Sequence, residues 1–399
     1  MRTELTLTPD ETAHAARVFA ALRAAIGAAG GALDFAAFMQ FALYAPGLGY
    51  YSAGAHKIGP GGDFTTAPEI SPLFGRCIAR QCREVLAVTG GSILEFGAGT
   101  GALAATILET LAELDALPER YEILEVSADL RARQQQRLGA LAPGLAARVG
   151  WLERLPETPL SGVLLANEVL DALPCERFVV RSARARRLGV ALAGAQGAAS
   201  DAESGATPGA AVGTLREVEL GDAPALPADL DVAALPEGYR GEYCPLLAPW
   251  IAALGATLGH GAALLCDYGL PRAALYHPDR RDGTLRCHFR HRVHDDPLVH
   301  VGLQDITAWV DFTAVAEAAV DAGLEVAGFT TQAALLLALG IEREVATTTP
   351  ESVRLARAAE ARRLLMPAEM GETFKAIALT RGLEQPLSGF ALQDLRRQL

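Results

Sequence analysis

The sequence predicts an α/β protein built on a mostly parallel sheet, and three observations carry this prediction. From Ile93 onward, short apolar segments alternate with amphipathic segments of helical length, which is the order expected of a parallel sheet with helices on both faces. The apolar segments are nearly continuous, as is typical of strands buried on both faces. A glycine-rich turn at residues 97–101 stands between one such segment and the next helical one. We also expect an N-terminal helical cap and an inserted antiparallel β subdomain.

Composition limits the classes of function. The 399 residues suffice for about two domains, and 50% hydrophobic with 21% charged residues is an ordinary globular composition. The net charge of -12 argues against broad binding to nucleic-acid phosphates, and it is compatible with a cationic substrate. No apolar run of about 18 residues occurs, so membrane insertion is not expected.

The expected compartment is the cytoplasm. The six cysteines have no paired spacing, which favours free thiols in a reducing compartment. The first residues lack the basic and apolar pattern of a signal or transit peptide. Oligomeric state cannot be inferred from these features.

Residues 1–90 are expected to form the helical cap and a covering loop. A first helix spans most of the first thirty residues and ends at Gly30 and Gly31. A second helix covers residues 34–44, and a loop rich in Gly, Pro and aromatic residues follows to Ser71. Ser71 is the expected N-cap of the next helix, with Pro72 at its first position.

Residues 91–180 are expected to form the first part of the sheet. The predicted strands and helices, in order, are strand 92–96, helix 102–114, strand 121–127, helix 128–141, strand 148–155 and strand 162–169. Residues 181–236 interrupt this rhythm with a tract rich in Ala, Gly and Ser. Because its flanks "ERFVVR" and "LREVEL" resemble antiparallel strands, we expect a hairpin-like inserted subdomain with a flexible tip.

The sheet is expected to resume in residues 237–382, ahead of a tail at 383–399. The predicted elements, in order, are a helix through 250–258, strand 261–269, a long Arg- and His-rich loop, helix 311–322, strand 324–332, further helices and strand 374–382.

The turn "FGAGTG" suits close approach of a ligand to the backbone. Gly97, Gly99 and Gly101 can adopt positive φ, and the following helix offers unpaired N–H groups with a partial positive charge. With Ala102, the same letters also match a dinucleotide-binding turn. The glycines alone therefore do not decide between a nicotinamide dinucleotide, a phosphate, some other ligand and a purely structural turn.

Two acids favour S-adenosylmethionine. Glu95 precedes the glycines at the end of one predicted strand, where a carboxylate repels a pyrophosphate but accepts from an ammonium. Glu125 ends the next strand, where an acid can hold both ribose hydroxyls. A ligand with a ribose, a cationic amino-acid portion and no phosphate fits both carboxylates.

A second polar group follows two later strands. "ANEVLDALP" supplies Asn167, Glu168 and Asp171, and Asp267 with Tyr268 ends the strand at 261–269. Ligands of open parallel sheets lie at the carboxyl ends of the strands, so these residues are expected near the transferred methyl group. The alternatives are acids favoured by a helix dipole for Glu168 and Asp171, and a strand-end cap for Asp267.

Several separate motifs indicate a known family. They are "YAPGLGYY", "GDFTTAPEIS", "ILEFGAGTG", "YEILEVSADLRARQ", "ANEVLDALP", "CDYG", "DGTLR" and "DITAWVDF". With them the chain resembles, over residues 35–382, the MidA family of class I S-adenosylmethionine-dependent methyltransferases, relatives of the mitochondrial methyltransferase that assists complex I assembly. The resemblance implies a Rossmann-like class I fold, S-adenosylmethionine as cofactor, and methylation of a protein arginine, in relatives that of a complex I subunit.

The resemblance also adds site residues. In "GDFTTAPEIS", Thr65, Thr66 and Glu69 are expected to close over the methionine end of the cofactor, the alternative being a rigid turn. Val126 and Asn167 complete the expected cofactor contacts. His291 matches a family histidine and is expected on the substrate side.

The same stretch raises the possibility of a metal. His288, His291 and His294 have regular spacing, but the interleaved arginines of "CHFRHRVH" would repel a cation, so no metal is expected. The chain departs from the family pattern at Ala128, at Cys287 with His288, and at Trp309. Two other functions remain open, a non-catalytic respiratory-complex assembly factor and a methyltransferase for a small molecule.

Overall fold

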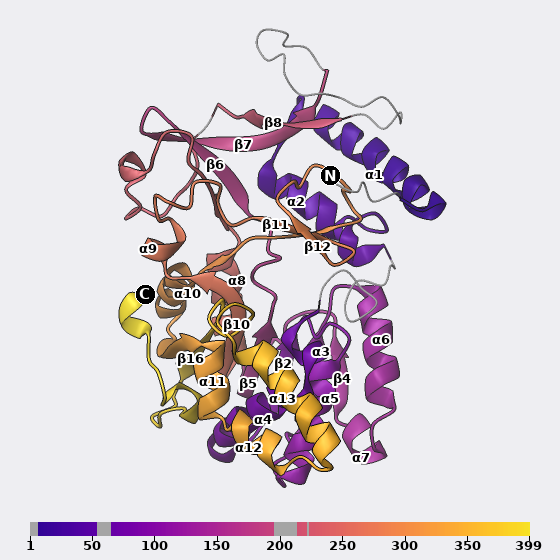
Figure 1. The fold of residues 1–399 in the computed structure, drawn as a ribbon, viewed down its shortest axis with the longest axis vertical. Coiled ribbons are helices and arrows are strands. Elements are labelled where there is room, and N and C mark those ends of the chain that lie inside the picture. The colour runs from indigo at the N-terminus through magenta and orange to yellow at the C-terminus, as the bar shows by residue number, and fades with distance from the viewer. Residues whose placement is uncertain (1–6, 54–64, 195–213, 222) are drawn as a thin grey trace. The chain divides into compact units, whose positions relative to one another are not determined.

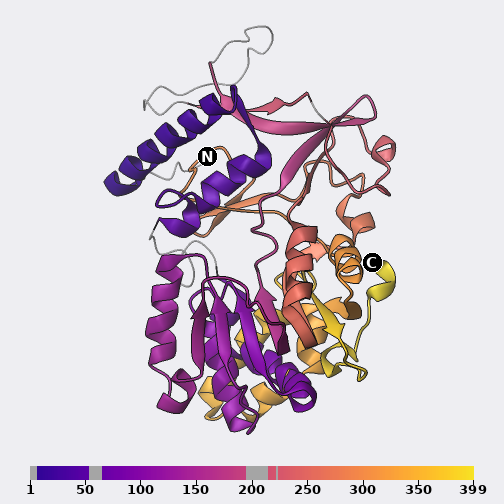
Figure 2. The same ribbon diagram turned by 180° about the vertical axis from the view of Figure 1, so that it is seen from behind.

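The computed structural model describes residues 7–53, 65–194, 214–221 and 223–399. The chain divides into two compact units (Figures 1 and 2). The core unit comprises His56–Leu173, Leu246–Leu275 and Trp309–Leu399, and the accessory unit comprises Met1–Ala55, Pro174–Pro245 and Tyr276–Ala308. Each unit thus collects separate stretches of the chain. The five-segment division expected from the sequence stays a prediction.

The core unit contains the predicted, mostly parallel sheet. Its strands run in the order β15-β16-β10-β5-β2-β3-β4. All neighbours along β10, β5, β2, β3 and β4 are parallel, whereas β16 is antiparallel to both β10 and β15. The strands are β2 (Ser92–Phe96), β3 (Tyr121–Leu124), β4 (Val149–Leu152), β5 (Leu160–Asn167), β10 (Leu258–Leu270), β15 (Glu325–Thr331) and β16 (Phe374–Arg381), and β14 (Val310–Asp311) adds a short parallel pairing to β10.

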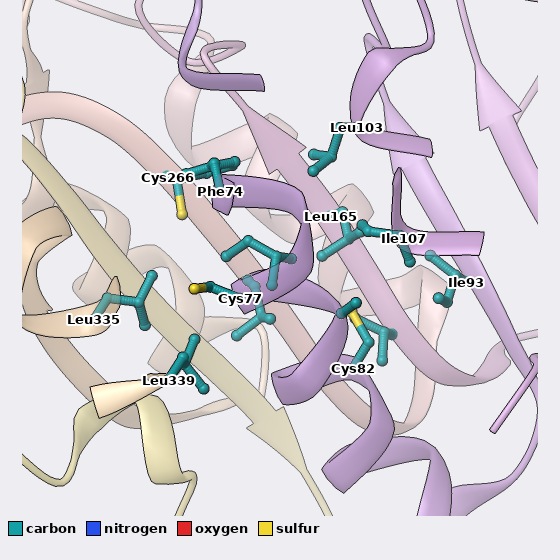
Figure 3. Packing of buried hydrophobic residues seen from close by; sticks show 14 of the residues in the cluster. Phe74, Cys77, Cys82, Ile93, Leu103, Ile107, Leu165, Cys266, Leu335 and Leu339 are labelled. Atoms are coloured by element: carbon teal, nitrogen blue, oxygen red, sulfur yellow. The ribbon is translucent and has the colours of Figure 1, made fainter. Parts of the chain in front are cut away.

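Helices cover both faces of this sheet. On one face, α4 (Pro72–Thr89), α5 (Ala102–Glu113) and α11 (Gln332–Ala338) pack against Ile93, Leu165 and Cys266 of the strands (Figure 3). On the other face, α8 (Leu247–Thr257) places Trp250 against Phe96, with 5.2 Å between ring centroids. The remaining helices of the core unit are α3 (Ala67–Ile70), α6 (Ala128–Gly139), α7 (Pro143–Ala146), α9 (Arg272–Leu275), α10 (Phe312–Asp321), α12 (Ile341–Thr347) and α13 (Glu351–Leu365).

Local signals set the helix boundaries. Ser71 caps α4 by accepting from Leu73 N, with Pro72 in the first turn, as predicted. Strand β3 ends at Leu124, three residues earlier than predicted. The reason is that Glu125 accepts from Ser127 N at 2.8 Å and Ser127 already caps α6, so residues 125–127 form the turn into the helix.

The accessory unit is antiparallel. A five-stranded sheet has the order β1-β7-β6-β9, with β8 paired to β7, and a three-stranded sheet has the order β12-β11-β13. The strands are β1 (Ala32–Asp34), β6 (Glu176–Arg181), β7 (Arg184–Leu192), β8 (Leu215–Glu219), β9 (Arg240–Tyr243), β11 (Arg286–Phe289), β12 (Arg292–His294) and β13 (Asp305–Thr307), joined by helices α1 (Pro9–Ala28) and α2 (Phe35–Tyr44).

This sheet corrects the expected hairpin in one respect. The predicted strands β6 and β8 do not pair with each other, because β7 lies between them. Charged residues fill the first half of β7, "RARRLGVAL", so its sequence does not stand out as a strand. The Arg- and His-rich segment predicted as a loop contributes β11, β12 and β13. The tip of the insertion, at 195–213, lies outside the described residues.

Two further features concern membranes and thiols. None of the helices in the described ranges combines the length and apolar character needed to cross a bilayer. All six cysteines are free thiols, and five of them are buried.

Candidate functional site

The expected site residues gather at one edge of the core sheet. Register pairs Phe96 with Leu124 and with Ala166, and Cys266 with Asn167. The carboxyl ends of β2, β3, β5 and β10 are therefore neighbours. The strand order reverses between β2 and β5, and ligands of open α/β sheets bind at such a switch point. We call this edge the rim, with a first half after β2 and β3 and a second half after β5 and β10.

The glycine turn lies at the centre of the rim. Gly97, Gly99 and Gly101 have φ values of 62°, 53° and 81°, all in the left-handed region. A Cβ atom on Gly97 would lie 3.2 Å from Val169 Cγ2, closer than ordinary packing. Gly101 is the N-cap of α5, so the turn leads directly into the first N–H groups of a twelve-residue helix, which lack partners within the helix.

Glu95 is a buried acid beside this turn. Its side chain is 2% exposed, and the Tyr121 hydroxyl donates to its Oε2 at 2.7 Å. Burial raises the pKa of Glu95 to about 7, and the nearby Glu125 adds to the rise. A cation next to such a carboxyl group would favour the ionised form.

Glu125 is held at both carboxylate oxygens. Ser127 N donates to Oε1 at 2.8 Å, and Gln134 Nε2 donates to Oε2 at 2.9 Å. Burial raises the pKa of Glu125, and these two hydrogen bonds oppose the rise. Val126 beside it is 82% exposed, an apolar surface next to the acid. Gln134 was missed in the sequence because it is one of three consecutive glutamines in a polar helix.

The predicted covering segment contacts the glycine turn. Glu69 accepts from the Thr100 hydroxyl and forms an ion pair with Arg137 at 3.5 Å. Thr66 is the N-cap of α3 without a side-chain capping bond, and Thr65 is half-buried. Glu69 is thus engaged within the protein, and its expected contact with the cofactor stays a prediction.

Asn167 and Glu168 begin the second half of the rim. Glu168 Oε1 accepts from Asn167 Nδ2 at 3.0 Å and from Ala67 N at 3.2 Å, which connects β5 to α3. Glu168 has a φ of 55°, a conformation that is uncommon for a residue other than glycine. Such outliers persist where surrounding contacts enforce them, often at functional sites.

The buried acids Asp171 and Asp267 form a cluster with the half-buried Tyr268. Asp267 Oδ2 accepts from the backbone N–H groups of residues 169, 170 and 171 at 3.1, 2.9 and 3.3 Å. These are the contacts of a capping carboxylate, the alternative considered for Asp267. The Tyr268 hydroxyl donates to Asp171 Oδ2. Burial raises the pKa of Asp171 to about 6 and that of Asp267 well above its ordinary value.

Two buried oxygens at this half have no donor. Within the described part of the chain, Asn167 Oδ1 and Asp171 Oδ1 are inaccessible to solvent and accept no hydrogen bond. Buried polar atoms without partners are rare, because leaving one unpaired costs about 1–3 kcal/mol.

His291 is part of a different unit of the chain from the residues of the rim. It belongs to the accessory unit, in the tight turn between β11 and β12, where Arg290 and His291 both have positive φ. Its side chain is exposed. A role on the substrate side stays a prediction. Among the residues that the structure describes, no group of three or more His, Cys, Asp or Glu side chains could hold a metal ion.

The fold and the rim define a class of protein. A sheet of this order, with a glycine turn after β2 and acids at the ends of β2 and β3, is that of a class I S-adenosylmethionine-dependent methyltransferase. Residues 77–330 match the family described as "Putative S-adenosyl-L-methionine-dependent methyltransferase". The chain belongs to this family, and S-adenosylmethionine is its cofactor.

Solved and curated relatives agree with this assignment. A superfamily member from Burkholderia thailandensis, crystallised with S-adenosyl-homocysteine, is 41% identical with a TM-score of 0.91, over 99% of this chain and 100% of that chain. The protein arginine methyltransferase NDUFAF7 of Danio rerio is 28% identical, over 86% of this chain and 82% of its own length. The Homo sapiens protein of that name is also 28% identical, over 92% and 84%. Both are named as mitochondrial proteins.

Proposed function

We propose that this methyltransferase methylates arginine in a protein substrate, with a subunit of respiratory complex I as the expected client. The observation that carries the proposal is the pair of unpartnered buried acceptors, Asn167 Oδ1 and Asp171 Oδ1. A guanidinium has five N–H donors and no acceptor, so it complements such a site. Curated relatives named as protein arginine methyltransferases support the same substrate.

The first half of the rim is proposed to hold the cofactor. The cofactor supplies a methyl group on a positively charged sulfur. Glu125, whose carboxylate is held by Ser127 N and Gln134 Nε2, is proposed to accept from the ribose hydroxyls. Glu95, with its raised pKa, is proposed to receive the ammonium group. The glycine turn at 97–101 gives the backbone room for close approach. The residues present therefore fit S-adenosylmethionine.

The second half is proposed to orient the acceptor nitrogen. Tyr268 holds one oxygen of Asp171, so the carboxylate cannot rotate freely and its other oxygen remains for the guanidinium. Orientation of this kind can contribute about 7–11 kcal/mol to a displacement reaction. As the N–C bond forms and the S–C bond breaks, the nitrogen must release a proton. Asp171, whose pKa burial raises to about 6, is proposed to accept it.

The test is methylation of candidate complex I subunits by the purified protein with S-adenosylmethionine. Mass spectrometry should find methylarginine in a client after incubation with the parent protein and much less with Asp171→Asn. Methyl groups found only on another residue type, at equal rates with both proteins, would refute the arginine assignment.

The two other candidate functions both predict no methylarginine in this assay, and two further measurements, client binding and incubation with metabolite extracts, separate them. A non-catalytic assembly factor would bind its client without methylating it, and a small-molecule enzyme would turn over metabolite extracts but no protein. We also expect a cytoplasmic location, which fractionation of the native cells would test. A pelleted membrane fraction retaining the protein after a salt wash would contradict it.

A further inference from the structure

Gln134 connects three parts of the first half of the rim. It lies in α6, and its side chain is fully buried at 0% exposure. Its amide nitrogen donates to the Gly99 carbonyl oxygen at 2.9 Å and to Glu125 Oε2 at 2.9 Å. Its amide oxygen accepts from Trp151 Nε1 at 3.0 Å. One side chain therefore joins the glycine turn after β2, the acid after β3 and strand β4.

The Trp151 indole determines which way the amide faces. An indole nitrogen can only donate, so the amide oxygen of Gln134 faces β4 and its two N–H groups are left for Gly99 and Glu125. If the amide were reversed, its NH₂ group would face the indole N–H of Trp151, so donor would meet donor. Its oxygen would face the Gly99 carbonyl and Glu125 Oε2, so acceptor would meet acceptor at both contacts. The observed orientation satisfies every polar atom of a buried amide, as burial demands.

This arrangement fixes the Glu125 carboxylate in space. Gln134 holds Oε2 and the backbone of Ser127 holds Oε1. Two oxygens at a fixed position suit two adjacent hydroxyl groups, which is how a ribose presents itself. The same amide also sets the carbonyl of Gly99, at the centre of the glycine turn.

We propose that Gln134 is a positioning residue for the cofactor, which holds the Glu125 carboxylate and the glycine turn in one fixed relation so that the ribose diol is recognised. The inference rests on the proposed role of Glu125 as ribose acceptor and is independent of the methyl acceptor. If Gln134 had only a structural role, it would stabilise the packing of α6 against β4, and its loss would not change how strongly the protein prefers a ligand with ribose hydroxyls.

The test compares two ligands by calorimetry, S-adenosylhomocysteine and its 2′,3′-dideoxy analogue. The variant is Gln134→Met, which keeps the length of the side chain without its hydrogen bonds. Its matched control is Gln135→Met, an exposed glutamine on the same helix. In the parent and the control, we expect the dideoxy analogue to bind about 10- to 150-fold more weakly, the range for lost hydrogen bonds to a charged group. In Gln134→Met this ratio should fall to a few-fold, because S-adenosylhomocysteine loses more affinity than the analogue, which makes no ribose contact with Glu125.

Two results would overturn the proposal. One is an unchanged ratio in a Gln134→Met protein whose circular dichroism matches the parent. The other is a parent protein that binds both ligands equally, because Glu125 would then hold no ribose. If the methionine variant does not fold, Gln134→Glu replaces it. That variant keeps the acceptor for Trp151 and sets a like charge beside Glu125, so the same fall in the ratio is expected. No methyl acceptor is present, so this experiment and the arginine assay fail independently.

Discussion

The two halves of the rim differ in how their polar groups are satisfied. After β2 and β3, Tyr121, Ser127 and Gln134 donate to the acids Glu95 and Glu125. After β5 and β10, by contrast, Asn167 and Asp171 each keep a buried oxygen without a donor in the described part of the chain. The protein's own hydrogen bonds hold the acids of the first half, whereas the second half keeps these two oxygens without a donor among the described residues, although Asp267, Glu168 and the other oxygen of Asp171 have donors.

This difference suggests a division of labour. A ligand that is the same in every turnover is best received by groups already held in position, because less ordering is required on binding. Groups that stabilise charge during the reaction are most effective when buried and aimed at the place where the charge develops. The first half fits a constant cofactor, and the second fits a cationic acceptor.

The largest expected effect comes from removing the glycine turn. Gly99→Val forces a β-branched residue to a φ of 53°, where L-residues are strained by about 1–2 kcal/mol. It also adds bulk where ligand and backbone must meet. We expect no detectable methyl transfer and no measurable binding of S-adenosylhomocysteine. Gly144→Val is the control, because a Cβ there meets nothing within 4 Å. Unchanged ligand affinity in Gly99→Val would mean that the turn is only structural.

The next largest effect is expected in the second half. Asp171→Asn keeps the shape of the side chain but removes the charge proposed to orient the guanidinium. Loss of a preorganised electrostatic group typically lowers turnover by about 10²–10³. Single-turnover methylation measures this, and the exposed acid at Asp321 provides the control variant Asp321→Asn. If Asp171→Asn methylates at the parent rate, Asp171 does not orient the guanidinium and its role is only structural.

Glu168 is expected to matter less than Asp171. Its Oε1 already accepts from Ala67 N and from Asn167. Glu168→Gln can keep one acceptor oxygen there, so we expect a smaller fall in turnover than for Asp171→Asn. A larger fall, measured in the same single-turnover assay, would make Glu168 the main carboxylate for the substrate.

A smaller effect is expected at the ribose acid. Glu125→Ala should weaken S-adenosylhomocysteine binding by about 1–3 kcal/mol, the value for hydrogen bonds to a charged group. Calorimetry measures the loss, and Glu153→Ala, at an exposed acid, is the control. If Glu125→Ala and Glu153→Ala bind S-adenosylhomocysteine with equal affinity, Glu125 does not contact the ribose.

A separate prediction concerns the pH dependence of stability rather than turnover or ligand affinity. Burial raises the pKa of Glu95 to about 7 from an ordinary value of 4.5. The folded protein therefore holds this proton more tightly than the unfolded chain does, so the stabilisation is full below pH 4.5 and is lost as the pH rises through about 7. Glu95→Gln lacks this loss, so its free energy of unfolding relative to the parent should increase between about pH 5 and pH 8. Denaturant titrations at both pH values measure it, and a constant difference would contradict the raised pKa.

The sequence predicted which strands and residues form the rim better than it predicted the hydrogen bonds among them. Alternating apolar and helical segments indicate the parallel sheet, and residues that directly follow its strands, such as Glu125 and Asp171, must share one edge of it. The sequence could not distinguish Gln134 from Gln135. Which of the two is buried depends on which side of α6 packs against its neighbours, and that is set by the tertiary structure. Strand β7 was missed because its first half is charged, and its place is set by pairing with β6 and β8.

The division of labour is tested most directly by one crossed measurement on Glu125→Ala and Asp171→Asn. For each variant, S-adenosylhomocysteine affinity is measured by calorimetry, and single-turnover methylation is measured at saturating S-adenosylmethionine. We predict that Glu125→Ala loses affinity but keeps most of its rate at saturation, whereas Asp171→Asn keeps its affinity and loses about 10²–10³ in rate. If both variants lower affinity and rate to the same extent, the two halves of the rim act as one site and the account is wrong.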